Sequence, residues 1–249
     1  MSKLIHLLSV SFVSFALAFF PQLQAGSRSN LFMENAGIRP VAGIHTVNTV
    51  IEKAKALFDS LDLDQLGLQQ EAFEYAYKGY HYLLEKGLIA KKGLLTICDF
   101  SQSSTHKRLY LVDMNTNEVL INTYVAHGKK SGGEFATSFS NSPESHKSSL
   151  GFYITGSVYR GNNGLSLRLQ GVDKGFNDRA AQRNIVVHGS DYATEQFLQH
   201  SNYLGRSYGC PAVPDNEIRE LTDIIKEGTC LFIYYPQKIY LERSKVLNG

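Results

Sequence analysis

The spacing of apolar residues changes from helical to strand-like near residue 94 of this 249-residue chain, and that change restricts its fold more than any other feature. Between residues 45 and 90, apolar side chains recur at helical spacing in two blocks that Gly67 separates. From Leu94 onward they fall instead in short runs rich in β-branched and aromatic residues, which are typical of strands. We therefore expect an α+β chain, with a helical hairpin over 45–90 before a mainly β domain over 91–249.

Seven strands and one late helix are expected in the second part. The strand runs are Leu94–Phe100, Arg108–Asp113, Val119–Ala126, Phe152–Tyr159, Leu165–Leu169, Ile185–Val187 and Leu231–Tyr235. A helix is expected from Pro214 to Glu227, because proline suits the first helical position and Gly228 follows the end. The polar segment 128–149 is long for a plain connection, and such loops are often functional.

The first 25 residues have the pattern of a signal peptide. Lys3 precedes an apolar run that Pro21 ends, and Ala25 offers a small residue for cleavage. An uncleaved membrane anchor is the alternative for this stretch. Residues 26–44 are rich in Gly, Ser and Asn and predict a flexible linker. We expect an exported chain of the periplasm or cell envelope, without membrane contact once the leader is removed.

Charge and histidine spacing argue against two classes of function. The formal net charge is +2 and the 25 Lys and Arg residues are dispersed, so no nucleic-acid partner is expected. The histidines lack a ligand spacing such as H-E-x-x-H, which argues against a zinc peptidase, and we expect neither a metal nor another cofactor.

The three cysteines occupy two kinds of sequence. Cys98 and Cys230 lie in apolar runs, where a buried and inert thiol is expected; a disulfide between them is the less favoured alternative. Cys210 instead follows Gly209 in a polar, glycine-containing segment close to the expected late helix. A surface turn and a reactive thiol are therefore expected at Cys210.

A histidine completes a nucleophile–base pair with this cysteine. His188 ends an apolar strand and precedes Gly189, whose carbonyl can accept one imidazole N–H and fix the tautomer. A nearby base and the start of a helix would lower the pKa of the Cys210 thiol. Glycines around the cysteine would let backbone N–H groups approach a substrate carbonyl and stabilise an oxyanion.

A serine nucleophile competes with Cys210 in the same segment. Gly205–Gly209 also matches the G-x-S-x-G elbow of α/β-hydrolases, with Ser207 as the attacking residue. That fold needs its histidine after the serine, but the last histidine of the chain is His200. The chain order therefore argues against Ser207.

Five ordered strings resemble the L,D-transpeptidase (YkuD-type) catalytic domain, and most closely its murein L,D-transpeptidase catalytic-domain-like branch. They are Ala126–Gly132 (AHGKKSG), Ser138–Asn141 (SFSN), Ser148–Tyr153 (SSLGFY), Asn177–Ala180 (NDRA) and Gly205–Val213 (GRSYGCPAV). The resemblance covers roughly residues 93–236 and leaves the N-terminal helices outside. It implies a β-rich fold and acyl transfer through a cysteine thioester, formed at the L-centre of diaminopimelate in a peptidoglycan stem peptide.

The resemblance also implies roles for single residues. Cys210 would be the nucleophile and His188 the general base, with the carbonyl of Gly189 orienting the imidazole. The backbone N–H groups of Gly209 and Cys210 would form the oxyanion hole, and Ser207 matches the Ser or Thr of the family's signature. Stem peptides are the implied substrates and carbapenems the implied inhibitors.

One departure from that signature lies next to the nucleophile. Tyr208 stands where the commoner signature has a second histidine, and a tyrosine hydroxyl cannot carry the imidazolium charge. His127 would compensate if the 128–149 loop folded over the site; otherwise it is a strand-end histidine without a role. Ser149 and Tyr153 are expected to line the cleft.

Two arginines are candidates for contacts with the substrate, and the acceptor of the acyl group is open. Arg206 and Arg183 would meet stem-peptide carboxylates, although surface arginine is the default for each. An L,D-transpeptidase is the leading hypothesis, and an L,D-carboxypeptidase that passes the acyl group to water is the nearest alternative. A non-catalytic peptidoglycan-binding protein is a further alternative, against which the intact Cys210 and His188 argue.

Overall fold

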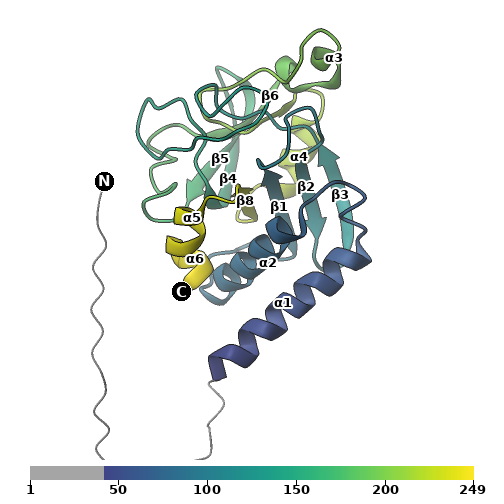
Figure 1. The fold of residues 1–249 in the computed structure, drawn as a ribbon. Helices are drawn as coiled ribbons and strands as arrows, with labels where there is room; N and C mark the ends of the chain where they lie inside the picture. The colour runs from purple at the N-terminus through teal and green to yellow at the C-terminus, as the bar shows by residue number, and fades with distance from the viewer. Residues whose placement is uncertain (1–41) are drawn as a thin grey trace, which may run out of the picture. The chain divides into compact units, whose positions relative to one another are not determined.

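The computed structural model describes residues 42–249, with side chains from Thr49 onward. These residues belong to a single unit of the chain. The predicted signal peptide and most of the predicted linker lie outside the described residues. The described part combines helices with one sheet, which confirms the α+β class (Figure 1).

The expected helical hairpin is present. Its helices are α1 (Ala42–Ser60) and α2 (Gln70–Glu85), so α1 begins inside the segment that was predicted as linker. The rings of Phe58 and Phe73 pack between them, with centroids 5.9 Å apart. Both rings are buried, so the hairpin closes over its own apolar seam.

Eight strands form one sheet in the described part of the chain, in the order β3-β2-β1-β8-β4-β5-β6-β7. Their bounds are β1 Leu94–Asp99, β2 Leu109–Asp113, β3 Glu118–Thr123, β4 Gly151–Gly161, β5 Gly164–Gly171, β6 Val186–Ser190, β7 Ala212–Pro214 and β8 Cys230–Tyr234. All seven predicted runs are strands. The pairs β1–β8 and β6–β7 are parallel, and the other neighbours are antiparallel.

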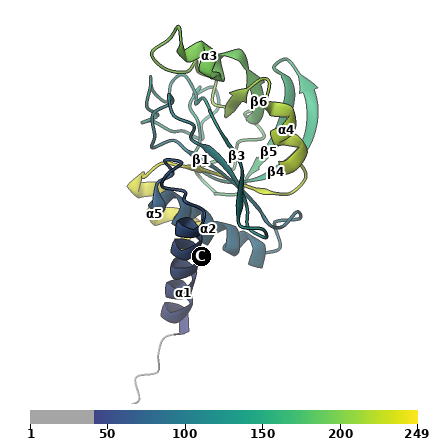
Figure 2. The ribbon, with the colours of Figure 1, turned by 90° about the vertical axis from the view of Figure 1, so that its right-hand side faces the viewer.

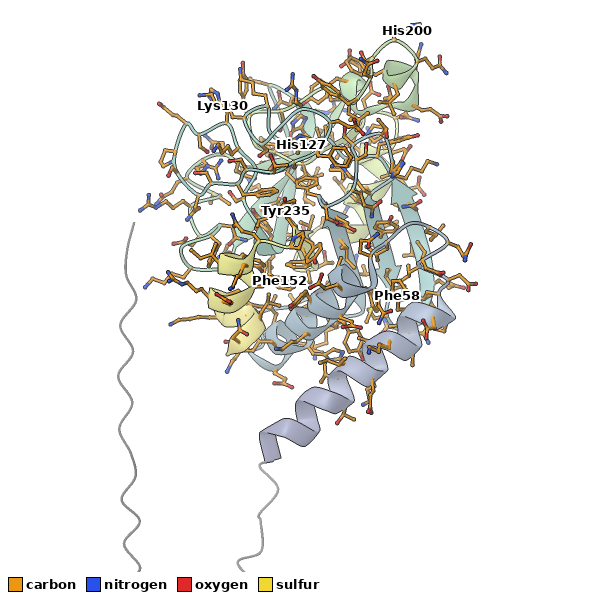
Figure 3. The ribbon with its side chains drawn as sticks, viewed as in Figure 1. Phe58, His127, Lys130, Phe152, His200 and Tyr235 are labelled. Carbon is orange, nitrogen blue, oxygen red and sulfur yellow. The ribbon has the colours of Figure 1, made fainter. Side chains whose placement is uncertain are left out.

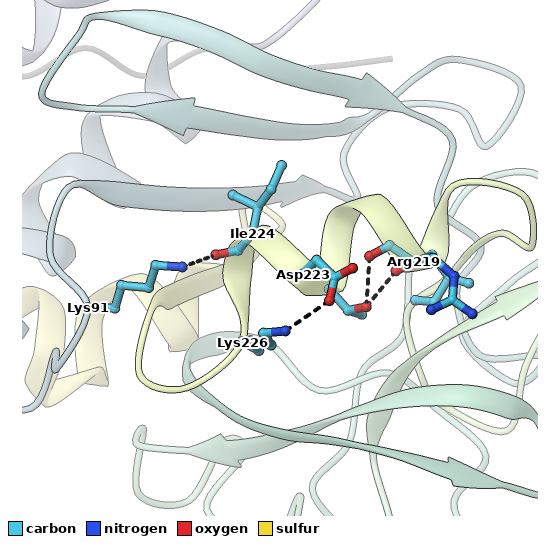
Figure 4. Close-up of polar contacts among 7 residues, drawn as sticks. Lys91, Arg219, Asp223, Ile224 and Lys226 are labelled. Carbon is cyan, nitrogen blue, oxygen red and sulfur yellow. Dashed lines mark hydrogen bonds and ion pairs between the residues drawn. The ribbon is translucent and has the colours of Figure 1, made fainter.

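Strand β7 and helix α4 (Ile218–Ile225) correct the prediction for the chain after Cys210. Pro214 ends β7 and does not open a helix, and α4 begins at Ile218. A three-residue strand that contains a proline carries too little pattern to be recognised from sequence. At the other end of α4, the ammonium of Lys91 donates to the carbonyl of Ile224 at 2.6 Å (Figure 4).

Helices pack near β1 and β8, the centre of the sheet. Helix α2 contacts both strands, and α5 (Lys238–Arg243) and α6 (Lys245–Asn248) lie beside it (Figure 1). Gly79 of α2 lies so close to the ring of Phe152 that an added Cβ would be 2.0 Å from it. Phe152 in turn stacks on Phe232 with centroids 4.1 Å apart.

Short helices lie near the edge of the sheet that β6 and β7 form. Helix α4 contacts β5, and the short helices η1 (Asp191–Ala193) and α3 (Glu195–Leu198) lie at the opposite end of the described part from α1 (Figures 1 and 2). None of the helices within 42–249 has the length and apolar character that crossing a bilayer demands.

Candidate active site

His188 lies on β6 with its imidazole orientation fixed. It pairs with Ser166 of β5 and Ala212 of β7, and its side chain is 4% exposed. Nδ1 is 2.9 Å from the carbonyl oxygen of Gly189. Because a carbonyl only accepts, Nδ1 carries the hydrogen and Nε2 keeps its lone pair. This is the orientation that the sequence analysis expected of Gly189.

Cys210 lies beside the same strand. The parallel pairing of His188 with Ala212, continued by two residues, places Cys210 next to Val186. The N–H of Val186 points at the thiol, and Sγ is 3.7 Å from the carbonyl oxygen of Asn184. The thiol thus lies at the start of β6, two positions before His188.

Burial leaves both groups neutral in the resting state. It raises the pKa of the Cys210 thiol, and the N–H of Val186 and the charge of Arg183 offset this only in part. Burial likewise lowers the pKa of His188. The expected lowering of the thiol pKa is therefore wrong, because β7 separates Cys210 from the start of α4 and burial outweighs the nearby positive charge.

Ser207 closes the turn that presents Cys210. Its Oγ accepts from the N–H of Gly209 at 3.0 Å and donates to the carbonyl of Cys210 at 2.6 Å. Gly209 has φ +125°, and an added Cβ would be 2.7 Å from the carbonyl oxygen of Lys147. One expected oxyanion donor, the N–H of Gly209, is thus engaged, whereas the N–H of Cys210 lies against its own sulfur.

The 128–149 loop folds onto this turn. Ser148 Oγ accepts from the N–H of Gly128 at 3.0 Å and donates to the carbonyl of Gly209 at 3.2 Å. Arg183, just before β6, donates to the carbonyls of Ser140 at 2.8 Å and Lys147 at 2.6 Å. Arg183 therefore holds the loop against the turn, in place of the substrate contact that the sequence suggested.

Ser149 and Tyr153 belong to the same support and do not line a cleft. Both are buried, and the hydroxyl of Tyr153 donates to the carbonyl of Ser149 at 2.9 Å. Ser149 Oγ donates to the carbonyl of Ser140 at 2.8 Å and accepts from Arg183. The expected cleft position is wrong for both residues, because their polar atoms are satisfied inside the protein.

His127 does not supply the charge that Tyr208 lacks. Its ring lies inside the molecule (Figure 3), 2.8 Å from the guanidinium of Arg108 through Nδ1 and edge-on to Phe100. Burial and the charge of Arg108 lower the pKa of His127 to about 3. Since arginine only donates, Nδ1 is the acceptor and the imidazole stays neutral.

Tyr208 lies at the surface between two groups that sequence reasoning missed. Its side chain is 64% exposed, with the ammonium of Lys129 4.2 Å from the ring centre and the ring of His146 at 4.6 Å. Arg206 is exposed nearby, and its guanidinium donates to the carbonyl of Gly132 at 3.1 Å. The AHGKKSG string carried Lys129, but no sequence pattern linked it to Tyr208.

The remaining cysteines and possible metal ligands lie apart from this chemistry. Cys98, Cys210 and Cys230 are all free thiols in the structure. Burial raises the pKa of Cys98 to about 12 and that of Cys230 further, as expected of inert core thiols. Within residues 42–249, no group of three or more His, Cys, Asp or Glu side chains is arranged to hold a metal ion.

A family model for the L,D-transpeptidase catalytic domain matches residues 64–234. The match includes α2, which the sequence-based resemblance had left outside. A search of curated proteins gave no significant match.

Solved structures with similarity to the chain include three that share little sequence with it. They are an L,D-transpeptidase from Mycobacterium smegmatis (12% identity over 57% of this chain and 59% of that one, TM-score 0.36), an L,D-transpeptidase in complex with imipenem (13%, 57% and 59%, 0.35) and the helical cell shape determining protein Pgp2 from Campylobacter jejuni (15%, 64% and 57%, 0.38). The chain thus spans about three fifths of the length of each.

Proposed function

Because the chain belongs to the L,D-transpeptidase catalytic domain family, we propose that it is a peptidoglycan L,D-transpeptidase that works through a thioester on Cys210. Its substrate would be a stem peptide, attacked at the carbonyl of the L-centre of diaminopimelate. The family supports a peptidoglycan-modifying role, and the neutral Cys210–His188 pair supports the thioester.

The first half-reaction follows from the protonation states of the two groups. As Sγ bonds to the substrate carbonyl carbon, its proton passes to Nε2 of His188, the nitrogen that keeps a lone pair. The N–H of Cys210, which lies against its own sulfur at rest, would turn to the developing oxyanion. The carbon–nitrogen bond then breaks, and the departing amine of the terminal D-amino acid takes the proton from His188. A thioester on Cys210 remains.

The second half-reaction regenerates the thiol. An amine of another stem attacks the thioester, His188 removes its proton, and the carbon–sulfur bond breaks. Cys210 leaves as a thiolate and recovers the proton from His188. Water in place of the amine would make the protein an L,D-carboxypeptidase by the same route.

One observation carries the proposal: His188 has a fixed tautomer on β6, two positions after Val186, whose N–H points at the thiol of Cys210. The Nδ1–H is engaged by Gly189 at 2.9 Å, so the imidazole can take a proton only on Nε2. Burial holds the pKa of His188 below its ordinary value of 6.5, so the basic form predominates at neutral pH.

Mass spectrometry of the full chain tests the proposal. We expect a covalent adduct on Cys210 with imipenem and with a disaccharide-tetrapeptide, and no adduct on Cys210→Ala. Cys98→Ala is the matched control, because that buried thiol should not react. An adduct retained by Cys210→Ala would contradict the thioester. Cross-linked dimer among the products indicates a transferase, and tripeptide alone indicates a carboxypeptidase.

Export belongs to the same proposal, since stem peptides lie outside the cytoplasmic membrane. The leader pattern of residues 1–25 supports it. N-terminal sequencing of the protein from the cell envelope should begin after Ala25, and a chain that keeps Met1 in the cytosol would contradict export.

A further inference from the structure

A cavity of about 400 Å³ lies beside the segment that leads to Cys210. Phe197 and Tyr203 give it aromatic walls, and Lys129 and Arg206 give it two cations. No carboxylate is among the described residues that line it. Its volume is in the range of about 300–1,000 Å³ that ligand pockets have. The cavity therefore combines apolar walls with uncompensated positive charge.

Neither cation has an acidic partner among the residues that the structure describes. The ion pairs there are Lys226–Asp223 and Lys238–Glu242. Arg206 uses one of its five N–H donors on the carbonyl of Gly132, and its guanidinium lies over the ring of Tyr203 at 5.3 Å. The ammonium of Lys129 lies over the ring of Tyr208. Both cations thus keep donors for a ligand.

Backbone contacts join this cavity to the reaction centre. Gly128 and Ser207 form a parallel bridge, and the N–H of Lys129 donates to the carbonyl of Ser207 at 2.8 Å. Ser207 is also the residue that closes the turn at Cys210. The chain from Arg206 to Cys210 spans about 14 Å at most, a distance that a short peptide covers.

We propose that this cavity binds a carboxylate of the peptide that Cys210 attacks, with Lys129 and Arg206 as the residues that select it. This inference rests on the proposed function. A guanidinium binds a carboxylate through two parallel N–H donors, and an ammonium adds a point charge. The aromatic walls contact the carbon skeleton beside the carboxylate. Either the terminal D-amino acid or the side chain of diaminopimelate supplies this carboxylate.

Tyr208 is a positioning residue in this arrangement. Its ring holds the ammonium of Lys129 at 4.2 Å, and the ring of His146 packs 4.6 Å from it. The family signature has a histidine at this place, where a neutral tyrosine stands here. Lys129 returns a positive charge to the neighbourhood, and it does so through the face of the ring and not through the hydroxyl.

Calorimetry tests the inference without turnover. It measures the affinity of the Cys210→Ala chain for a tetrapeptide stem. We expect Arg206→Gln and Lys129→Met each to weaken binding about tenfold, as the loss of one charge-assisted hydrogen bond does. Tyr208→Leu should act like Lys129→Met, whereas Tyr208→Phe should bind as the parent does. Equal binding by all variants would overturn the inference.

Matched controls come from cations with the same local geometry elsewhere. Lys86 lies over Tyr82 at 5.0 Å and Arg168 over Tyr159 at 4.3 Å, both away from the cavity. Lys86→Met and Arg168→Gln should leave peptide binding unchanged. Weakening by these controls equal to that by the cavity variants would mean a general charge effect and would also overturn the inference.

Two amidated peptides distinguish the sources of the carboxylate. If the terminal carboxylate enters the cavity, the peptide with a terminal amide should bind the parent and Arg206→Gln alike, and the peptide amidated on diaminopimelate should still discriminate between them. The reverse pattern assigns the diaminopimelate carboxylate. Discrimination that survives both amidations excludes both carboxylates and overturns the inference.

Imipenem separates failure of the inference from failure of the proposed function. If imipenem acylates Cys210 in the wild type while the cavity variants bind peptide normally, the inference fails and the thioester stands. If the parent binds no peptide, the inference also fails. Absence of an imipenem adduct would then contradict the proposed function as well.

Discussion

At the scale of single residues, Cys210 and His188, the proposed nucleophile and base, are both neutral at rest. Burial disfavours the charged form of each group, which raises the pKa of a thiol and lowers that of an imidazole. In the proposed reaction the proton would then move to His188 while the sulfur attacks. A preformed thiolate–imidazolium ion pair would require the opposite shifts.

The rate of thiol alkylation against pH tests this. Because the pKa of Cys210 lies above its ordinary value of 9.0, iodoacetamide should react slowly at neutral pH and faster as the pH rises past that value. The rate would be followed by intact-mass spectrometry, with Cys210→Ala as the blank. A plateau of rapid alkylation between about pH 6 and 8 would indicate an ion pair and contradict the neutral pair.

Ser207 gives a second test at this scale. Ser207→Ala removes the acceptor of the Gly209 N–H and the donor to the Cys210 carbonyl. We expect imipenem acylation to slow about tenfold, since a buried unsatisfied group costs about 1–3 kcal/mol and here misplaces the nucleophile. Ser207→Thr keeps the hydroxyl and should react nearly as the wild type. Normal acylation of Ser207→Ala would show that other contacts hold the turn.

The sequence was sufficient to predict the residues whose role depends on near neighbours. The N–H of Gly209, expected in the oxyanion hole, donates to Ser207 Oγ instead. The orienting carbonyl of Gly189 is adjacent to His188, so that contact could be anticipated. The pKa of the thiol could not, because burial depends on the whole fold. The same holds for His127, which becomes neutral through Arg108, a residue from a different strand region.

At the scale of elements, the strands were predictable because each carries an apolar run of its own. Strand β7 was not, since three residues ending in Pro214 show no period. Because β7 was not predicted, the start of α4 was placed too close to Cys210. The prediction that the start of this helix lowers the pKa of the thiol was wrong for the same reason. The packing of the 128–149 loop was equally hidden, because Arg183 reaches carbonyls that lie 36 and 43 positions away in sequence.

A variant of Arg183 tests whether this side chain holds the 128–149 loop. Arg183→Met removes the donors to the carbonyls of Ser140 and Lys147, which should release the loop from the turn at Gly209. We expect faster amide hydrogen exchange over residues 138–149 and at least tenfold slower imipenem acylation.

Arg160, exposed near the end of β4, provides the control. Arg160→Met should change neither the exchange over residues 138–149 nor acylation. Unchanged exchange in Arg183→Met would show that the serine contacts hold the loop alone. Faster exchange with normal acylation would mean that the loop does not position Cys210.

At the scale of the whole molecule, the family match from residue 64 to 234 joins α2 to the sheet that carries the site. Helix α2 contacts β1 and β8, and α6 packs against it. The sequence-based boundary at residue 91 followed the change of periodicity, which marks a change of secondary structure and not of domain. The contact through Gly79 and Phe152 shows why, since only a glycine lets α2 approach the sheet there.

Asp173 connects the C-terminal helices to the sheet. Its carboxylate accepts from the N–H of Phe152 at 2.9 Å, the hydroxyl of Tyr240 at 3.1 Å and that of Ser244 at 2.5 Å. Asp173→Ala leaves three buried donors unsatisfied, so we expect the free energy of unfolding in urea to fall by about 3 kcal/mol. Asp223→Ala, in an exposed ion pair, should leave it unchanged. A small loss in Asp173→Ala would show that apolar packing alone holds α5 and α6 in place.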